Sequence, residues 1–331
     1  MSAPVRRLLH LAALAFAPLP WLVVAWMDRP ALAVAPGPRQ VRVMSFNIAV
    51  GGEACGQPLE QTAAVIRASG ADVVGLQETV VPGKVRGGRD IDNGPRLARL
   101  LGWNFVKQPN NRGILTPLEV VETIATGSGA RLRTNDGVDI LVFNVHLAPA
   151  PYQPYQLCGV PADGAAAIRT EAEAIASARA SRGTHVDALL ADIQRYRRAD
   201  EPIFITGDFN EPSHEDWTSV AAEAGHCPFA VSFPSTRALS DAGFVDAYRA
   251  AHPDPVRAPG RTWTTRTRLD DPHDRHDRID FVFVDFGAAA APGSRRVQSA
   301  QVMGESTANA DVVVSPWPSD HRAVVATVQI P

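Results

Sequence analysis

The segment at residues 203–217, IFITGDFNEPSHEDW, carries the sequence feature from which the fold can be argued. Four apolar or β-branched residues lead into a glycine, and Asp208 and Asn210 follow on either side of Phe209. If the backbone stays extended, side chains two residues apart share a face, so Asp208 and Asn210 would point one way and Phe209 into the core. A strand that ends in a solvated turn and a strand that ends at a catalytic site both explain this pattern.

The rest of the chain alternates between strand-like and helix-like segments. Ser213, with Asp216 three residues later, is typical of a helix start and predicts a helix from Ser213 to about Gly225. The segment 163–198 has helical periodicity in two pieces, with a break expected at Gly183. Strands are expected within 41–50, 71–79, 130–147, 203–208, 278–286 and 310–330, and further helices at 59–70, 94–102 and 244–253. This order predicts a mixed sheet, or two packed sheets, flanked by helices.

Residues 1–33 have the layout of a secretory signal peptide. Two arginines precede an apolar run at 8–26, and the sequence ALA at 31–33 offers a cleavage site. Cleavage predicts a single mature domain at 34–331, exported to the periplasm or the extracellular space, with no stable membrane span. The alternative is an uncleaved N-terminal anchor, because about 20 apolar residues can span a bilayer, although two prolines interrupt this run.

The bulk composition is that of a globular protein with little net charge. Hydrophobic residues make up 45% and charged residues 20%, and the formal charge is −3. Residues 1–33 hold three arginines and one aspartate, so their removal changes the formal charge to −5. A mildly acidic chain does not favour strong non-specific binding of nucleic acid. Nucleic acid is therefore an open partner that charge does not indicate, and a monomer is expected.

Polar residues recur where apolar runs end or begin. Each of them alone is explained by an ordinary turn or a solvated strand end, but ligand sites of sheet proteins gather where strand ends converge. Carboxylate and amide oxygens suit a hard divalent cation, and imidazoles suit protons and phosphate oxygens. The recurring positions are Asn47, Gln77, Glu78, Asn144, His146, Asp208, Asn210, Asp280, Asp320 and His321.

Six short motifs occur together in a fixed order: SFNI at 45–48, LQET at 76–79, NVHL at 144–147, GDFN at 207–210, RIDFVFV at 278–284 and SDHRAV at 319–324. With these motifs the chain resembles the endonuclease/exonuclease/phosphatase superfamily, the DNase I-like metal-dependent phosphoesterases, over residues 40 to 331. The resemblance implies an α+β fold of four layers, in which two mostly antiparallel mixed sheets pack face to face with helices outside.

The resemblance also implies roles at matching positions. Glu78 is expected as the principal Mg²⁺ ligand, with Asn47 and Asp320 beside it, and with Mn²⁺ or Ca²⁺ as substitute ions. Asp208 and Asn210 are expected to position the attacking water and hold a phosphate oxygen. Alternatively, Asp208 acts as the general base or helps to bind a second metal.

Two histidines complete the implied catalytic set. His321 is expected beside the phosphorus and to be oriented by Asp280. His146 is expected on the phosphate or on the leaving group.

The substrate contacts are weaker predictions, because the region between LQET and NVHL does not match the DNA-repair branch securely. Arg112, Tyr152 and Trp317 are the candidate contacts. The class predicted is a Mg²⁺-dependent hydrolase of phosphate esters, most simply a phosphodiesterase. A secreted nuclease and a sphingomyelinase-like lipid phosphodiesterase are the alternatives within it, and a catalytically inactive binding protein is the alternative outside it.

Two further features allow more than one interpretation. The loop RLDDPHDRHDRID at 268–280 is interpreted as a charged surface loop rather than a second metal site, because the spacing of His273 and His276 fits no defined ligand pattern. The three cysteines are too widely spaced for a zinc motif. A bridge between Cys55 and Cys158, with Cys227 free, is the predicted pairing in an oxidising compartment.

Overall fold

The computed structural model describes residues 39–330, apart from 84–87, 161–163 and 288–295. Its contacts divide the chain into a unit at 1–37 and a unit at 38–331, and the description below concerns the second. The predicted signal peptide at 1–33 therefore lies outside the described residues. None of the helices within the described ranges is long and apolar enough to span a membrane.

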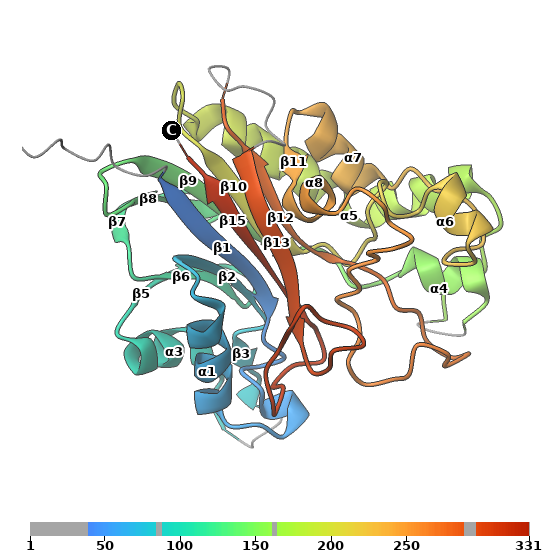
Figure 1. Cartoon of the computed structure of the whole chain (residues 1–331), viewed down its shortest axis with the longest axis horizontal. Helices are drawn as coiled ribbons and strands as arrows, with labels where there is room; N and C mark the ends of the chain where they lie inside the picture. The colour runs from blue at the N-terminus through green and yellow to red at the C-terminus, as the bar shows by residue number, and fades with distance from the viewer. Residues whose placement is uncertain (1–38, 84–87, 161–163, 288–295, 331) are drawn as a thin grey trace, which may run out of the picture. The chain divides into compact units, whose positions relative to one another are not determined.

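Two β-sheets form the centre of the fold (Figure 1). The first has the strand order β14-β13-β15-β1-β2-β6-β5 and the second the order β11-β12-β10-β9-β8-β7. The first sheet contains β1 (Gln40–Asn47), β2 (Val73–Gln77), β5 (Asn104–Gln108), β6 (Arg112–Thr116), β13 (Val297–Gly304), β14 (Val312–Val313) and β15 (Ala323–Gln329). The second contains β7 (Glu119–Thr123), β8 (Gly129–Arg133), β9 (Asp139–His146), β10 (Ile203–Asp208), β11 (Val245–Asp246) and β12 (Asp280–Asp285).

Both sheets are mixed but mostly antiparallel. The parallel pairs are β1 with β2, β13 with β14, and β9 with β10. The remaining pairs of the two sheets are antiparallel, as is a small separate hairpin of β3 (Val80–Val81) and β4 (Ile91–Asp92).

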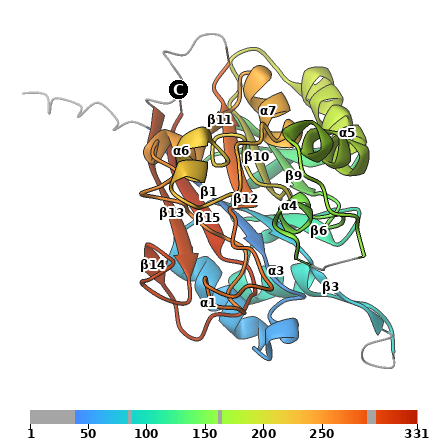
Figure 2. The same cartoon turned by 90° about the vertical axis from the view of Figure 1, so that its right-hand side faces the viewer.

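Helices cover the outer face of each sheet (Figures 1 and 2). The helices beside the first sheet are α1 (Leu59–Ser69) and α3 (Asn93–Leu101), and those beside the second are α5 (Glu171–Tyr196) and α7 (Pro234–Asp241). The shorter elements are η1 (Glu53–Cys55), α4 (Gln153–Cys158), α6 (Ser219–Glu223) and α8 (Ala247–Ala251). The predicted four-layer α+β architecture is confirmed.

The alternation of side chains along the strands builds these layers. On β1, Val43 lies in the core shared by the two sheets, while Met44 lies in the core under α1 and α3. On β10, Phe204 lies between the sheets, while Ile205 lies in the core under α5 and α7. Since successive strand residues face opposite sides, each strand contributes to two apolar layers, which explains why these runs are almost continuously apolar.

Two predictions about helices were wrong. Gly183 does not break α5, which is continuous over 26 residues and starts at a capping box of Thr170 and Glu173. A glycine inside a helix costs only about 1 kcal/mol, which the packed apolar face of a long helix offsets. The predicted helix start at Ser213 is also wrong: the Ser213 hydroxyl accepts from the Glu215 N–H in a turn, and the helix of this segment, α6, starts later, at the N-cap Thr218.

Candidate active site

Three neighbouring strands of the second sheet hold His146, Asp208 and Asp280 in one line. Asp208 is the register partner of His146 on β9 and of Asp280 on β12. Val142 lies four positions before His146, and Phe204 lies four positions before Asp208. Both apolar side chains lie in the core between the sheets. The side chains of His146, Asp208 and Asp280 therefore point to the same face of the sheet and lie at one end of the core between the two sheets. His146 Nε2 lies 3.5 Å from Asp208 Oδ2.

The first sheet contributes Asn47, at the end of β1, and His321, just before β15. Asn47 Nδ2 lies 3.0 Å from Asp208 Oδ2, 3.1 Å from Glu78 Oε1 and 3.4 Å from His321 Nε2. One buried amide group thus contacts side chains from both sheets. Asp208, Asp280 and His321 also form a group whose ligand-type atoms all lie within 4.8 Å of one another.

His321 is buried between two carboxylates. Its Nδ1 lies 2.9 Å from Asp280 Oδ2, and its Nε2 lies 3.7 Å from Asp208 Oδ2. Burial lowers the pKa of His321, but the charges of Asp280 and Asp208 outweigh burial and raise this pKa to about 10. Burial raises the pKa of the Asp280 carboxyl, which the charge of His321 in turn lowers. The pair is therefore an imidazolium held by a carboxylate at neutral pH.

The segment around His321 fixes the position of its ring. The Ser319 hydroxyl donates to the Asn47 carbonyl and accepts from the His321 N–H. Trp317 Nε1 donates to the His321 carbonyl over 2.7 Å. The Trp263 ring packs against the imidazole with 4.8 Å between the ring centroids.

The GDFN segment differs from a plain extended strand end. Phe209 is fully buried and packs edge-on against Phe281, as the alternation predicts. Asn210, however, adopts a left-handed backbone conformation with φ 49°, which asparagine tolerates better than most residues. Its N–H donates to Asp208 Oδ1, and its Nδ2 donates to the Leu147 carbonyl. The expectation that an extended backbone places Asn210 beside Asp208 was wrong, because the chain turns there.

The residues predicted as metal ligands lie at the same end of the sheets. Glu78 follows β2, has a left-handed φ of 56° and is half-buried. Asp320 Oδ2 lies 3.4 Å from Arg266 Nε. After burial, Asp320 and Glu78 both contribute to raising the pKa of the nearby Cys55 thiol. The carboxylate oxygens at this end of the sheets fit a hard divalent cation such as Mg²⁺, whereas the amide oxygen of Asn47 accepts from the Ala49 N–H.

The predicted substrate contacts lie in different environments. Arg112 donates from Nη1 to the Asn144 carbonyl and from Nε to the Pro109 carbonyl. Tyr152 is buried, and its hydroxyl donates to Asp277. Trp317 is half-buried beside Phe46. Of the three predicted contacts, Trp317 is the one that donates a hydrogen bond to a residue of the Asp208–Asp280–His321 group, at the His321 backbone carbonyl.

Sequence reasoning missed a second polar layer under the site. Asn144, counted above among the strand-end residues, is fully buried and accepts from Gln77 Nε2 and Thr206 Oγ1. Its own amide donates to Gln108 Oε1 and to two backbone carbonyls. A signal was present, because Asn144 lies two residues before His146 and therefore points to the same face, one step deeper.

A buried ion pair that the sequence did not indicate supports the two loops beside the site. Arg182 on α5 donates to the carbonyls of Ala148 and Pro151, in the loop after His146. Its Nη1 lies 3.7 Å from Glu211 Oε2, and both side chains are fully buried. Glu211 directly follows the GDFN segment, so one guanidinium links this segment to the loop after β9.

The predicted Cys55–Cys158 bridge was wrong, because all three cysteines are free thiols. The Cys55 thiol is surrounded by Arg266, Asp320 and Glu78, whereas the charges near Cys158 are those of Arg275 and Asp277. The two thiols therefore lie in different environments.

The 268–280 loop is held by contacts within it. Thr267 donates to Asp274, and His276 Nε2 lies 2.9 Å from the Arg268 carbonyl. His273 belongs to no group of metal-type ligands among the described residues, in line with the interpretation as a surface loop.

Comparison with known proteins relates these features to a family. The model of the endonuclease/exonuclease/phosphatase family matches residues 44–321. An uncharacterized protein from Caenorhabditis elegans is 27% identical in an alignment of 311 positions that covers 86% of this chain and 90% of that protein.

Solved structures can be aligned with most of the chain. An endonuclease/exonuclease/phosphatase from Beutenbergia cavernae has a TM-score of 0.52 and 20% identity, over 88% of this chain and 72% of its own. An AP endonuclease from Archaeoglobus fulgidus has a TM-score of 0.49 and 16% identity, over 88% of this chain and 100% of its own. Because the family model spans most of its residues, the chain belongs to the endonuclease/exonuclease/phosphatase family, whose members are generally hydrolases of phosphoester bonds.

Proposed function

We propose that the protein hydrolyses phosphodiesters with Mg²⁺, at the group formed by Asn47, Glu78, Asp208, Asp280 and His321. The observation that carries the proposal is the position of His321, whose ring bonds to Asp280 on one side and faces Asp208 and Asn47 on the other. A buried cationic imidazole at the mouth between two sheets suits an anionic substrate.

The proposed metal ligands are Glu78, Asn47 and Asp320, with Mn²⁺ or Ca²⁺ as substitutes. A divalent cation held by these oxygens would polarise a phosphoryl oxygen and stabilise the leaving oxygen. Asn47 Nδ2 lies 3.1 Å from Glu78 Oε1, and the charges of Glu78 and Asp320 both act on the Cys55 thiol, which supports one ligand group for these three residues.

The chain's own residues supply the rest of the reaction. Asp208 would orient the attacking water and accept its proton, since its carboxylate is buried and its Oδ2 lies within 3.0 Å of Asn47 Nδ2. His321, kept charged by Asp280, would donate a hydrogen bond to a phosphate oxygen. His146, with 18% of its side chain exposed, is the group that can reach the leaving oxygen. Asn210 would hold the loop that carries His146 through the Leu147 carbonyl.

The setting of the protein follows from the sequence and is part of the proposal. The layout of residues 1–33 supports export, and the formal charge supports a small phosphodiester or a lipid head group over bulk nucleic acid. A monomer is proposed for the exported domain.

The test is hydrolysis of bis(p-nitrophenyl) phosphate by the purified protein, with Mg²⁺, with EDTA, and after Glu78→Ala. We expect metal-dependent turnover and at least a hundredfold loss of kcat in the variant, since one charge-stabilising group contributes about 3–4 kcal/mol. Glu60→Ala, which removes an exposed carboxylate from α1, is the matched control and should retain full activity.

The same assay decides between the alternatives. DNA, a choline phospholipid and p-nitrophenyl phosphate extend the panel to a nuclease, a lipid phosphodiesterase and a monoesterase. If no substrate on the panel is turned over in a metal-dependent way, the proposal fails, and the inactive binding protein becomes the better interpretation.

A further inference from the structure

Arg261 differs from the other arginines of the described chain. Among those that are not exposed, it is the one whose guanidinium makes no hydrogen bond, ion pair or ring contact. Burial lowers the pKa of this guanidinium, as expected for a cation without a bonded counter-ion. Leaving a charge half-buried and unpaired is costly, so the absence of a partner calls for a ligand.

The carboxylates near Arg261 are engaged elsewhere. Asp277 acts electrostatically on Arg261, but its oxygens accept from Tyr152 Oη over 2.8 Å and from Trp217 Nε1 over 2.9 Å. Asp216 lines the same cavity as Arg261 and Asp277, and its carboxylate accepts from the guanidinium of Arg278. Neither carboxylate supplies the hydrogen-bond acceptors that Arg261 lacks.

A second cation lies close to the first. Arg275 acts on Arg261 electrostatically and disfavours the charge of Arg261. Arg275 Nη2 donates to the His226 carbonyl, but its Nε is buried without a partner. Two guanidiniums with unused donors therefore act on each other's surroundings.

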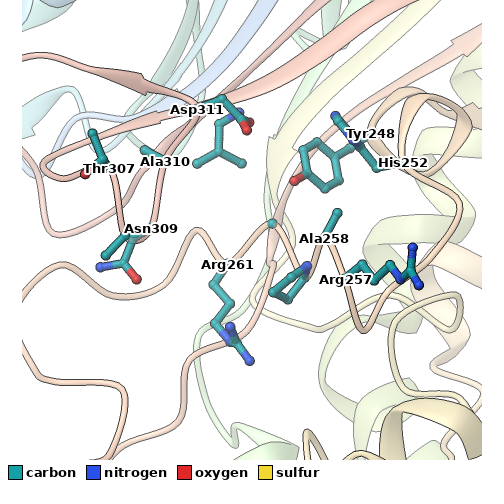
Figure 3. Close-up of a pocket in the computed structure, with 13 residues that line it drawn as sticks. Tyr248, His252, Arg257, Ala258, Arg261, Thr307, Asn309, Ala310 and Asp311 are labelled. Atoms are coloured by element: carbon teal, nitrogen blue, oxygen red, sulfur yellow. The ribbon is translucent and has the colours of Figure 1, made fainter.

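Two cavities meet at Arg261. The smaller is lined by Trp217, His226, His276 and Asp277, and the larger, of ≈ 200 Å³, by Tyr248, His252 and Asn309; Pro259 and Arg261 belong to both walls. Figure 3 shows the Arg261 guanidinium pointing away from Tyr248 and Asp311, while Arg257 points away from Arg261. The cation is therefore accessible and far from the acidic side of the larger cavity.

We propose that Arg261 is the anchor of an oxyanion site, which binds a phosphate or carboxylate group where the two cavities meet. The planar guanidinium offers paired N–H donors that match the oxygens of either group. No residue that lines either cavity belongs to the proposed catalytic group, so the proposal does not depend on the proposed function.

The experiment uses NMR of tryptophan indole N–H groups in the metal-free full chain. Trp217 reports on the Arg261 site, because it lines the smaller cavity and bonds Asp277, and Trp263 reports on the catalytic side, because its ring packs against His321. Inorganic phosphate and acetate are titrated separately. We expect a saturable shift of the Trp217 signal, and the anion that binds more tightly identifies the ligand class.

Two variants with the same change of charge test the anchor. Arg261→Met should weaken the binding reported by Trp217 at least tenfold, whereas Arg257→Met, at an arginine whose side chain is 89% exposed, should leave it unchanged. Without added anion, Arg261→Met should melt at or above the wild-type temperature, because an unpaired cation has been removed, and phosphate should raise the melting temperature of the wild type more than that of the variant. Arg261→Lys keeps the positive charge but removes the paired N–H donors of the guanidinium, so it should bind the anion more weakly than the wild type.

Two results would contradict an anion site at Arg261. Equal affinity in Arg261→Met and the wild type, or a Trp217 signal that does not respond to either anion, would rule out the site. Trp217 and Trp263 shifts that follow one binding curve in every variant would mean that the anion binds only at the catalytic group.

Discussion

His321 and Asp280 form the closest charged contact of the catalytic group, and their pairing makes stability depend on pH. The pKa of His321 is raised from its ordinary value near 6.5 to about 10 in the folded protein. A group with a raised folded pKa stabilises the fold fully below its unfolded pKa, and this contribution is lost as pH rises through the folded pKa.

We therefore expect the free energy of unfolding to fall between about pH 6.5 and pH 10, by on the order of 2–3 kcal/mol. Urea unfolding in EDTA at a series of pH values measures it. His321→Gln should show a much flatter profile in this range. The assignment is wrong if the variant and the wild type lose stability in parallel.

At this scale, the sequence allowed the identity of the site residues to be predicted but not their surroundings. Asp280 and His321 lie in recognisable motifs, and the structure brings them within 2.9 Å. The left-handed turn at Asn210 could not be predicted, because asparagine adopts extended and left-handed conformations alike. Arg261 gave no signal at all, since an arginine without a partner is recognised only when its neighbours in space are known.

The strand β2 depends on a residue without a side chain. A Cβ at Gly75 would lie 1.9 Å from Thr206 Oγ1 and 2.6 Å from Asn144 Oδ1, so the two sheets approach too closely here for any larger residue. Overpacking of this kind typically costs about 1–3 kcal/mol.

Gly75→Ala should therefore lower the free energy of unfolding by at least about 2 kcal/mol, as measured by urea titration. Gly183→Ala is the matched control, because a Cβ there has Arg179 at 3.9 Å as its nearest neighbour. Inside a helix that change should stabilise by about 0.5–1 kcal/mol. Effects of the same sign and size in the two variants would contradict this account.

The helix α5 reaches the catalytic group through Arg182. Burial raises the pKa of Glu211, while the charge of Arg182 lowers it, so each buried ion depends on the other. Removing one member of a buried pair commonly costs about 3–5 kcal/mol, because the other charge is left unpaired.

Arg182→Met should therefore destabilise the protein by about 3 kcal/mol or more. The double variant Arg182→Met with Glu211→Gln should recover part of the loss, which a double-mutant cycle in urea measures. Arg179→Met, at an exposed residue on the same helix, should change stability by less than about 0.5 kcal/mol. Additive effects of the two single changes would show that the pair is not coupled.

Elements were predictable where apolar periodicity was strong. The strand at 41–50 was predicted from its alternation and the strand at 203–208 from an apolar run that leads into a motif, and both are present. The errors at Gly183 and Ser213 both came from a local propensity of less than about 2 kcal/mol, and at Gly183 the packing of α5 against the second sheet overrides it.

A metal ion bound at Glu78, as proposed, should raise the free energy of unfolding of the whole molecule. A ligand at a hundred times its dissociation constant adds about 2.7 kcal/mol to the unfolding free energy. Mg²⁺ added to EDTA-treated protein should therefore raise the melting temperature measured by differential scanning calorimetry. Glu78→Gln should lose this rise while keeping the melting temperature of the metal-free form, and an equal rise in the variant would place the ion elsewhere.

The neighbours β1 and β15 have a consequence for how the protein is made. Asn47 ends β1 near the start of the folded unit, whereas His321 precedes β15 near its end, and the two strands pair with each other. A ribosome between codons 280 and 321 has produced Glu78, Asp208 and Asp280, but neither the histidine nor β15, which pairs with β1. The proposed activity therefore begins only once synthesis has passed β15, and copies truncated before it cannot attack phosphoesters inside the cell that makes them.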